Sequence, residues 1–193
     1  MPPEPNPLCA DAAALAAMTD ERLMLSFRVG HSEAFSELFR RHSSAIYGFF
    51  RRRLENPSRA EELSQETFVA VLRGVERYEP RSTFRTYLYG IAIKILMAER
   101  RKDARRKASA EIAPGMSADS GVDAAIWVRR AVEQLDEDHR DILLLREYEQ
   151  LTYDEIAVLL HLPVNTVRSR LFRARSALKA ALLPLRPEMR NEP

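Results

Sequence analysis

The sequence contains a single cysteine, Cys9, among 193 residues. One cysteine excludes an internal disulfide and any zinc finger built on cysteine pairs, and it agrees with a reducing compartment. Long apolar runs are also missing, since no stretch reaches the roughly 18 to 20 uninterrupted apolar residues that cross a bilayer. The first residues lack the basic-then-apolar order of a secretory signal. We therefore expect a cytoplasmic protein with no membrane insertion.

Residues on which enzymes and metal sites depend are sparse and scattered. The histidines show no metal-ligand spacing; they are His31, His42, His139 and His161. No glycine-rich phosphate loop is present, and no serine stands in the context of an activated nucleophile. Glu62 and Glu66 form an i,i+4 pair but lack the Glu-x-x-His partners of a helical metal site. These absences argue against an enzyme, and we expect no metal and no other cofactor.

The total charge is nearly balanced, but the charges are unevenly distributed. Lys and Arg number 30 and Asp and Glu 28, which gives a formal net charge of +2. Residues 81–108 carry nine basic and two acidic side chains, a net of +7, and residues 166–193 carry seven and two, a net of +5. Residues 109–165 carry four basic and 12 acidic side chains, a net of −8. Two separated basic blocks are typical of phosphate binding, although solvated helix faces can produce the same pattern.

The apolar periodicity predicts an all-α protein built from two small helical domains joined by a flexible linker. Apolar residues recur at spacings of three and four, and no alternating strand pattern is present. Proline, glycine and serine without periodicity indicate the linker. The predicted divisions are a mobile N-terminal extension at 1–18, a first domain at 19–107, the linker at 108–122, a second domain at 123–185 and a tail at 186–193. Met18 is an alternative start of translation.

Capping residues and breaks predict where several helices begin. Ser58, with Glu61 three residues on, predicts a capping box. A loop from Tyr78 to Ser82 precedes a long helix from about Thr83 to Lys107. The side chains of this helix that we expect to pack inward are Phe84, Tyr87, Leu88, Ile91, Ile95 and Ala98. In the second domain we predict helices at about 123–135, 137–149, 152–160 and 164–183.

The second domain has the pattern of a helix-turn-helix. Thr152 with Glu155 caps a short helix that ends at His161-Leu162-Pro163, and a basic helix follows. Winding the basic helix places one apolar stripe inward: Val164, Val167, Leu171, Ala174 and Leu178. The opposite side offers side chains suited to reading base edges: Asn165, Thr166, Arg168, Ser169, Phe172 and Arg173. Cations on the flanks are placed for phosphate contacts: Arg170, Arg175 and Lys179. A merely solvated amphipathic helix is the alternative.

Two surfaces of the first domain mix apolar and polar side chains. Val69 lies within a polar strip that contains Glu62, Gln65 and Glu66; one exposed valine usually has no function, but here it could centre a docking patch for a basic protein surface. On the long helix, aromatic and apolar side chains lie near cations, which suits unstacked single-stranded bases. These side chains are Tyr89, Ile93 and Met97. Periodicity supports equally the alternative that they pack on an earlier helix.

Two long stretches, residues 60–102 and 135–178, resemble the extracytoplasmic-function (ECF) sigma factors, the smallest group of the sigma-70 family of bacterial RNA polymerase. The first, which begins AEELSQETFVAVL, resembles domain 2 of that family, and the second, which contains LTYDEIAVLLHLPVNTVRSRLF, resembles domain 4. The resemblance implies a dissociable, non-catalytic subunit that directs promoter-specific initiation by reading −35 duplex and −10 melted DNA. It also implies three partners, core RNA polymerase, promoter DNA and an anti-sigma factor, and no obligate homo-oligomer.

The resemblance also implies roles for particular residues. The polymerase-docking helix corresponds to residues 60–73, so the strip of Glu62, Gln65, Glu66 and Val69 would face the clamp helices of the largest catalytic subunit. Residues assigned to the −10 region are Tyr78, Arg81, Ser82, Arg85, Tyr87, Lys94, Arg100 and Arg101. The basic helix corresponds to the −35 reader. The acidic linker residues would follow the RNA exit path: Glu111, Asp119 and Asp123.

Four positions depart from the family pattern. Lys94 stands where Asn is usual, which suggests a phosphate contact in place of hydrogen-bond readout. Tyr87 replaces a frequent Trp and keeps an aromatic ring. Asp136 replaces a common Pro and can itself cap the following helix. His161 replaces Gly in the turn, where a positive φ is uncommon for other residues, although His is among the more tolerant.

One other class of function fits the second domain taken alone, an autonomous helix-turn-helix regulator with an N-terminal sensing or dimerisation domain. A sensing domain needs a pocket or a symmetric interface. The first domain instead offers a polar strip and a cationic, aromatic loop and helix. We therefore prefer the sigma-factor interpretation.

Overall fold

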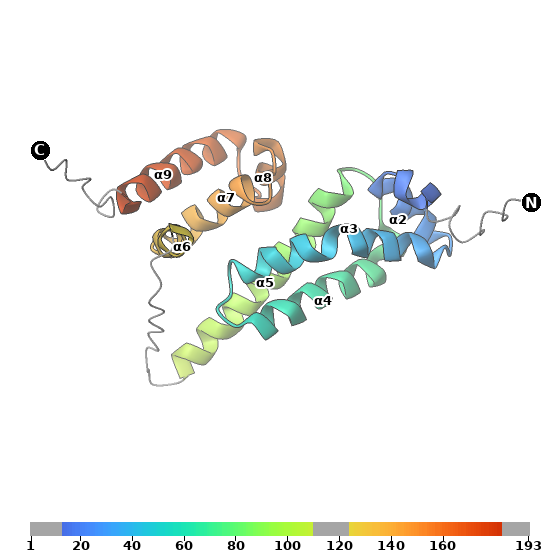
Figure 1. Ribbon diagram of the computed structural model, residues 1–193, viewed down its shortest axis with the longest axis horizontal. Helices are drawn as coiled ribbons and strands as arrows, with labels where there is room; N and C mark the ends of the chain where they lie inside the picture. The colour runs from blue at the N-terminus through green and yellow to red at the C-terminus, as the bar shows by residue number, and fades with distance from the viewer. Residues whose placement is uncertain (1–12, 110–123, 183–193) are drawn as a thin grey trace, which may run out of the picture. The chain divides into compact units, whose positions relative to one another are not determined.

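The computed structural model describes residues 13–109 and 124–182, without the side chains of 107–109 and 124–126. The chain divides between Glu111 and Ile112 into two compact units, each of which is described by itself. All regular secondary structure in the described ranges is helical (Figure 1), which confirms the all-α prediction. Residues 1–12, most of the predicted linker with Glu111, Asp119 and Asp123, and the predicted tail lie outside the described residues.

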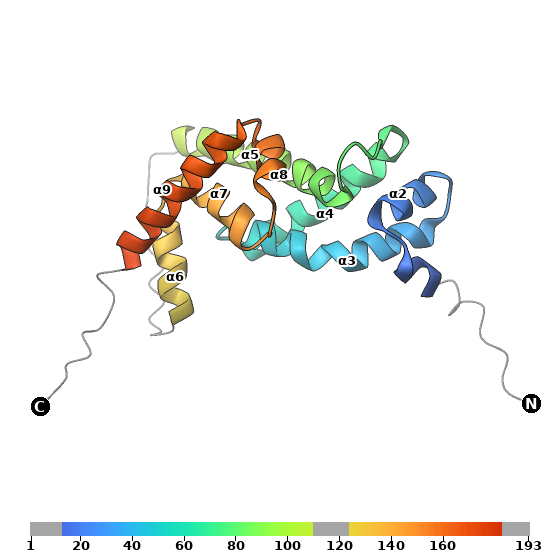
Figure 2. The ribbon, with the colours of Figure 1, turned by 90° about the horizontal axis from the view of Figure 1, so that it is seen from above.

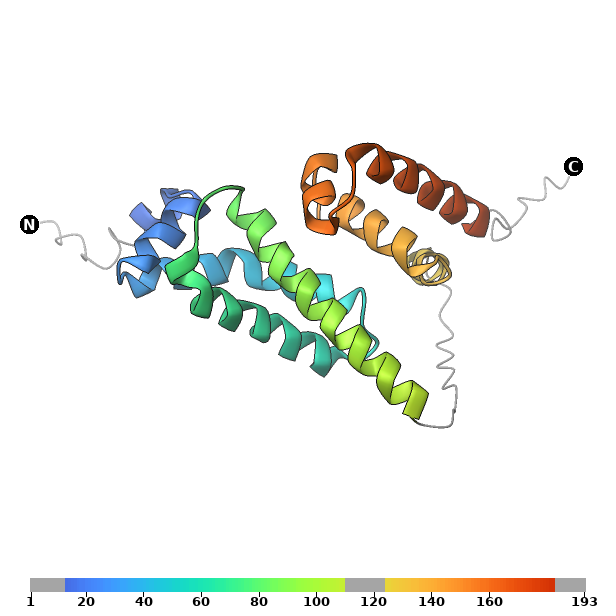
Figure 3. The same ribbon diagram turned by 180° about the vertical axis from the view of Figure 1, so that it is seen from behind.

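The main helices of the N-terminal unit are α2 (Asp20–Arg28), α3 (Ser32–Arg51), α4 (Pro57–Gly74) and α5 (Phe84–Ser109), with one 3-10 turn, η1 (Val75–Arg77). Helix α3 packs against α2 and α4, and α4 packs against α5, which lies beside it in Figure 3. Large apolar side chains from all four helices are buried in one core: Leu23, Met24, Leu38, Phe49, Phe50, Leu63, Phe84 and Leu88. This core holds α4 and α5 in fixed register.

The start of α4 differs from the sequence prediction. Asn56, and not Ser58, is the capping residue, because Asn56 Oδ1 accepts hydrogen bonds from the backbone N–H groups of Ser58 and Arg59 at 2.9 and 3.3 Å. Pro57 occupies the first turn, where its missing N–H costs no hydrogen bond. The predicted capping box of Ser58 and Glu61 is therefore wrong by two residues.

Residues 13–18 belong to the folded part, although we expected the folded domain to begin at residue 19. Residues 13–17 form a helical turn. The carbonyl groups of Leu15 and Ala16 in this turn, and of Met18 just after it, accept hydrogen bonds from the Arg41 guanidinium at 3.1, 2.8 and 2.9 Å. A guanidinium at a helix C-terminus satisfies carbonyl groups that the helix itself cannot.

The buried side of α5 is rotated from the predicted one. Ile95 is only half-buried and Ala98 is exposed, whereas Tyr89, Ile93 and Glu99 are buried. The Tyr89 ring lies 5.7 Å from that of Phe49 in α3. For Tyr89 and Ile93 the packing alternative is therefore correct, because α5 is covered by α2 and α3 as well as by α4. Met97 remains exposed.

The C-terminal unit contains α6 (Ala124–Glu133), α7 (Glu137–Glu147), α8 (Tyr153–Leu160) and α9 (Val164–Leu182). Helix α9 packs against the other three (Figures 1 and 2). Asp136 caps α7 by accepting the His139 N–H at 3.0 Å, as predicted. The predicted capping box of Thr152 and Glu155 is present at the start of α8. His161 ends α8 at φ 53° and ψ 44°, the left-handed conformation that the turn requires.

No helix in the described part of the chain is long and apolar enough to span a membrane.

Candidate nucleic-acid and protein interfaces

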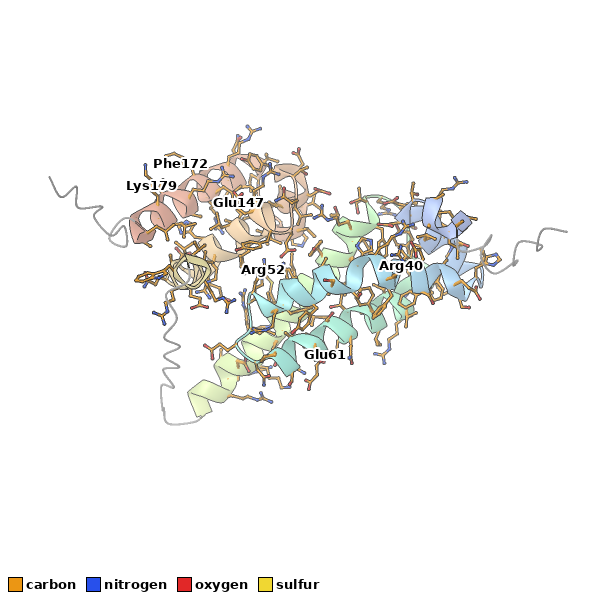
Figure 4. All side chains as sticks on the ribbon, in the orientation of Figure 1. Arg40, Arg52, Glu61, Glu147, Phe172 and Lys179 are labelled. Carbon is orange, nitrogen blue, oxygen red and sulfur yellow. The ribbon has the colours of Figure 1, made fainter. Side chains whose placement is uncertain are left out.

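Helix α9 presents one broad exposed face, and the middle of its predicted inner stripe is buried. Val167, Leu171 and Ala174 are buried, whereas Val164 and Leu178 at the two ends of the stripe are half-buried. On the outer side, the Phe172 side chain is 73% exposed (Figure 4). The neighbouring outward side chains are exposed too, apart from half-buried Thr166: Asn165, Arg168, Ser169 and Arg173. The Pro163 carbonyl accepts the N–H groups of Thr166 and Val167, which fixes the direction in which α9 leaves the turn.

Several outward polar groups of α9 are held by local hydrogen bonds. Ser169 Oγ donates to the Thr166 carbonyl at 3.0 Å, so its oxygen can still accept a hydrogen bond. Arg168 Nη1 lies 3.5 Å from Asn165 Oδ1, at the limit of hydrogen bonding. The face thus combines amide, hydroxyl and guanidinium groups around an aromatic ring. These groups match the donors, acceptors and methyl groups on the base edges of a major groove.

Carboxylates of α7 pair with two flank cations of α9. Arg170 Nη1 lies 2.8 Å from Asp138 Oδ2. Arg175 donates to Glu147 Oε1 from Nη2 at 2.7 Å and from Nε at 3.1 Å, and this bond raises the pKa of Arg175 above its usual value. The third predicted flank cation, Lys179, is exposed. Sequence reasoning missed both ion pairs, because the partners are 32 and 28 residues apart along the chain.

The loop before α5 is anchored by Tyr78, which is only 2% exposed. Its ring lies 5.1 Å from that of Tyr87 and 6.3 Å from that of Phe84. Burial raises the pKa of Tyr78 to about 12. The Tyr78 carbonyl accepts a hydrogen bond from Arg28 Nη1 at 3.1 Å. The resemblance assigned Tyr78 to the −10 region, and in this structure its side chain is part of the core of the N-terminal unit.

The remaining residues assigned to the −10 region lie on the loop and along α5. Arg81 and Ser82 are exposed, and Arg81 pairs with Glu79 at 2.6 Å. Arg85 is half-buried, with its guanidinium 5.7 Å from the centre of the Tyr89 ring. Farther along α5, Lys94 and Arg101 are exposed and Arg100 is half-buried. Tyr87 is also half-buried.

The polar strip on α4 is exposed along its whole length. Glu62, Gln65 and Glu66 are exposed, and Val69 between them and the end of the helix is 41% exposed. Two further exposed apolar side chains lie on these helices, Leu72 three residues after Val69 and Phe39 of α3, whose ring is 4.8 Å from that of Phe68 in α4; neither was predicted. An apolar centre beside carboxylates is the composition of a protein-binding patch.

Arg59 organises the N-terminal end of this strip and was not predicted. Its Nη1 lies 2.6 Å from Glu62 Oε2 and 3.5 Å from Glu66 Oε1. Its Nε and Nη2 donate to the two oxygens of buried Glu99 in α5, each at 2.7 Å. These bonds lower the pKa of Glu99 and raise that of Arg59. The pair of Arg59 and Glu99 therefore joins the α4 strip to α5.

The two units match two parts of a single protein family. Residues 38–106 match the family model "Sigma-70 region 2" and residues 125–178 match "Sigma-70, region 4". The RNA polymerase sigma-H factor of Pseudomonas aeruginosa is 33% identical over 183 residues, which cover 86% of this chain and 95% of that protein. The ECF RNA polymerase sigma-E factor of Escherichia coli is 30% identical over 185 residues, which cover 87% and 96%. The chain belongs to the ECF sigma factors of the sigma-70 family.

Two solved structures share the fold of this sigma factor. A structure of CnrH in complex with the cytosolic domain of CnrY superposes with a TM-score of 0.66 at 24% identity and covers 87% of this chain and 99% of CnrH. The sigma factor RpoE from Bartonella quintana, in complex with the anti-sigma factor NepR, has a TM-score of 0.66 at 21% identity and covers 77% and 96%.

Membership of the family decides between the two functions considered from the sequence. An ECF sigma factor directs promoter-specific transcription initiation as a subunit of RNA polymerase, so the autonomous regulator is not favoured. In the described residues of this sigma factor, no group of three or more His, Cys, Asp or Glu side chains could hold a metal ion.

Proposed function

We propose that this ECF sigma factor reads the −35 element with the exposed face of α9, contacts melted −10 DNA with the loop and cations of α5, and docks on core RNA polymerase through the α4 strip. The observation that carries the proposal is the outward face of α9, where Phe172 is 73% exposed among hydrogen-bonding and cationic side chains. An exposed phenylalanine is costly in water, and contact with a thymine methyl or a sugar offsets that cost.

At the −35 element, α9 lies in the major groove, whose width of about 12 Å admits an α-helix. Asn165, Thr166, Ser169 and Arg173 face the base edges. Arg168 also lies on this side, while the flank cations Arg170, Arg175 and Lys179 meet the phosphates. Each good bidentate base contact contributes about 1–3 kcal/mol of discrimination.

At the −10 element, the cations carry the contacts and Tyr78 positions the loop. Arg81 and Ser82 of the exposed loop meet the melted strand, and Arg85 and Lys94 follow its backbone along α5. Arg100 and Arg101 extend this line of charge toward the duplex. Half-buried Tyr87 supplies an aromatic ring against which a base can pack. The buried position of Tyr78 supports a role in holding the loop in place.

On the protein side, Glu62, Gln65, Glu66 and Val69 face a basic surface of core polymerase. The exposed carboxylates provide charge complementarity, and Val69 with its apolar neighbours provides the area that is dehydrated on binding. We also propose that an anti-sigma protein binds this sigma factor, since the CnrH and RpoE structures described above are complexes, the latter with an anti-sigma factor. The protein acts in the cytoplasm, where polymerase and promoters are located, and catalyses no reaction itself.

Run-off transcription with core RNA polymerase and a promoter library tests the proposal. The protein should confer initiation on a small set of templates that share a −35 and a −10 element. Initiation on none of them, together with duplex binding by the protein alone, would refute the proposed mode of action.

A further inference from the structure

The ion pairs between α7 and α9 divide the arginines of α9 into two groups. Arg170 and Arg175 stand on opposite flanks, since five residues at about 100° each place them about 140° apart around the helix. Each has its own carboxylate, Asp138 or Glu147, at 2.7–2.8 Å. Within the described residues, neither Arg168 nor Arg173 of the outward face pairs with a carboxylate. The sequence-reading face thus keeps its charge, whereas two of the three flank cations are paired with carboxylates.

The stabilising effect of these ion pairs is small. The arginine side chains remain 33% and 49% exposed and the carboxylates 70% and 46%. Ion pairs as exposed as these contribute about 0–1 kcal/mol to folding. The pairs also weaken the attraction of α9 for DNA, because a guanidinium already paired with a carboxylate attracts a phosphate less than an unpaired one. When a DNA phosphate approaches, the carboxylate must either share the arginine with it or give the arginine up. Both are unfavourable, because the carboxylate and the phosphate repel each other.

We propose that Asp138 and Glu147 restrain the affinity of α9 for the DNA backbone, so that the free sigma factor holds duplex DNA weakly until polymerase positions it. This inference rests on the proposed reading of duplex DNA by α9. Both carboxylates pair with flank cations, which are proposed to contact phosphates and not bases. The restraint therefore acts on the sequence-independent part of DNA binding. Selection among promoters then depends on the outward face and on the additional contacts available to the holoenzyme.

The test measures how the full-length protein binds a mixed-sequence duplex, by fluorescence anisotropy over a series of salt concentrations. Asp138→Asn and Glu147→Gln remove the charges and keep the side-chain shapes. Each restored phosphate contact steepens the fall of log affinity with log salt by at most about 0.9. A slope of this size corresponds to a change of about 3.5-fold in affinity between 50 and 200 mM salt. We expect each variant to bind about threefold tighter than the wild type at the low-salt end, with the gain lost at the high-salt end.

Two controls assign the effect to the ion pairs. Glu133 is an exposed residue of α6 in the same unit and belongs to neither ion pair. Glu133→Gln removes the same charge and should leave the affinity for duplex DNA unchanged. Asp138→Asn should have no effect in an Arg170→Ala background, and Glu147→Gln none in an Arg175→Ala background. Circular dichroism checks that every variant remains folded.

The outcomes separate this inference from the proposed function. If Arg170→Ala and Arg175→Ala leave duplex affinity unchanged, these arginines do not contact phosphates, and the proposed DNA contacts of the flanks fail. If both alanine variants weaken binding but Asp138→Asn and Glu147→Gln do not strengthen it, the restraint is refuted and the DNA contacts stand. Weaker binding by the Asn and Gln variants would also refute the restraint and make the carboxylates positioning groups for the arginines.

Discussion

Replacement of Arg59 by methionine tests the ion pair that joins α4 to α5. Both oxygens of Glu99 accept hydrogen bonds from Arg59 at 2.7 Å, and Glu99 is only 7% exposed. Removing one partner of a buried pair costs about 3–5 kcal/mol, because the other charge is left buried without compensation. The Arg59 side chain is 27% exposed, so some solvent reaches the pair and we reduce the expected cost to about 2–4 kcal/mol.

Urea denaturation measures this cost at pH 7. The single tryptophan of the chain, Trp127, lies in α6, so its fluorescence reports on the C-terminal unit. Far-UV circular dichroism reports on both units. We expect Arg59→Met to shift the circular dichroism transition of the N-terminal unit and to leave the Trp127 transition unchanged. A second variant, Arg59→Met with Glu99→Met, should recover most of the loss, because it leaves no buried charge.

The same pair predicts how the cost depends on pH. The pKa of Glu99 is lowered in the folded protein from its ordinary value of 4.5, first by hydrogen bonds from Arg59. A lowered carboxyl pKa contributes stability that is present above the unfolded value and lost as pH falls through the folded value. The difference between the wild type and Arg59→Met should therefore narrow below pH 4.5. A cost under about 1 kcal/mol at pH 7, or a difference that does not change with pH, would refute the reasoning.

Three further substitutions test the two interfaces and the α4–α5 connection. Val69→Asp should abolish binding to core polymerase in a pull-down while Val69→Ala only weakens it; equal binding by both would remove the strip from the interface. Arg173→Ala should cost about 1–3 kcal/mol of promoter affinity and relax preference at one base position, whereas a uniform loss on all sequences would make it a phosphate contact. Gly74→Ala places a Cβ 2.8 Å from the Tyr87 hydroxyl and should destabilise the N-terminal unit by about 1 kcal/mol. That cost should disappear in a Tyr87→Phe background, and a cost that persists there would assign it to another contact.

Features that depend on neighbouring residues could be predicted from the sequence. The capping box of Thr152 and Glu155 and the Asp136 cap each join residues three apart, so residue types and spacing were sufficient. The buried stripe of α9 followed from helical periodicity, which also indicated the exposed position of Phe172. Even local prediction failed where two capping residues compete, since Asn56 with Pro57 displaced Ser58 as the start of α4.

Features that depend on which helices meet could not be predicted in the same way. Periodicity left the role of Tyr89 and Ile93 undecided, and the contacts of α5 with three other helices made both core residues. Tyr78 has a polar hydroxyl and lies in a loop, and both properties favour an exposed position. Its ring is nevertheless buried against those of Tyr87 and Phe84. A loop residue is buried when the ends of the helices on either side of it leave room for a ring, and sequence spacing does not encode that distance.

The sequence by itself determined that the chain is helical, that it has two domains, that two basic blocks lie apart, and which face of α9 points outward. Each of these depends on composition or on periodicity within one helix. Only the tertiary structure decided which carboxylate meets which arginine, across 40 residues for Glu99 and Arg59, 32 for Asp138 and Arg170, and 28 for Glu147 and Arg175. The physical reason is that interhelical ion pairs depend on the rotation and separation of packed helices, which are set by how the core side chains fit together.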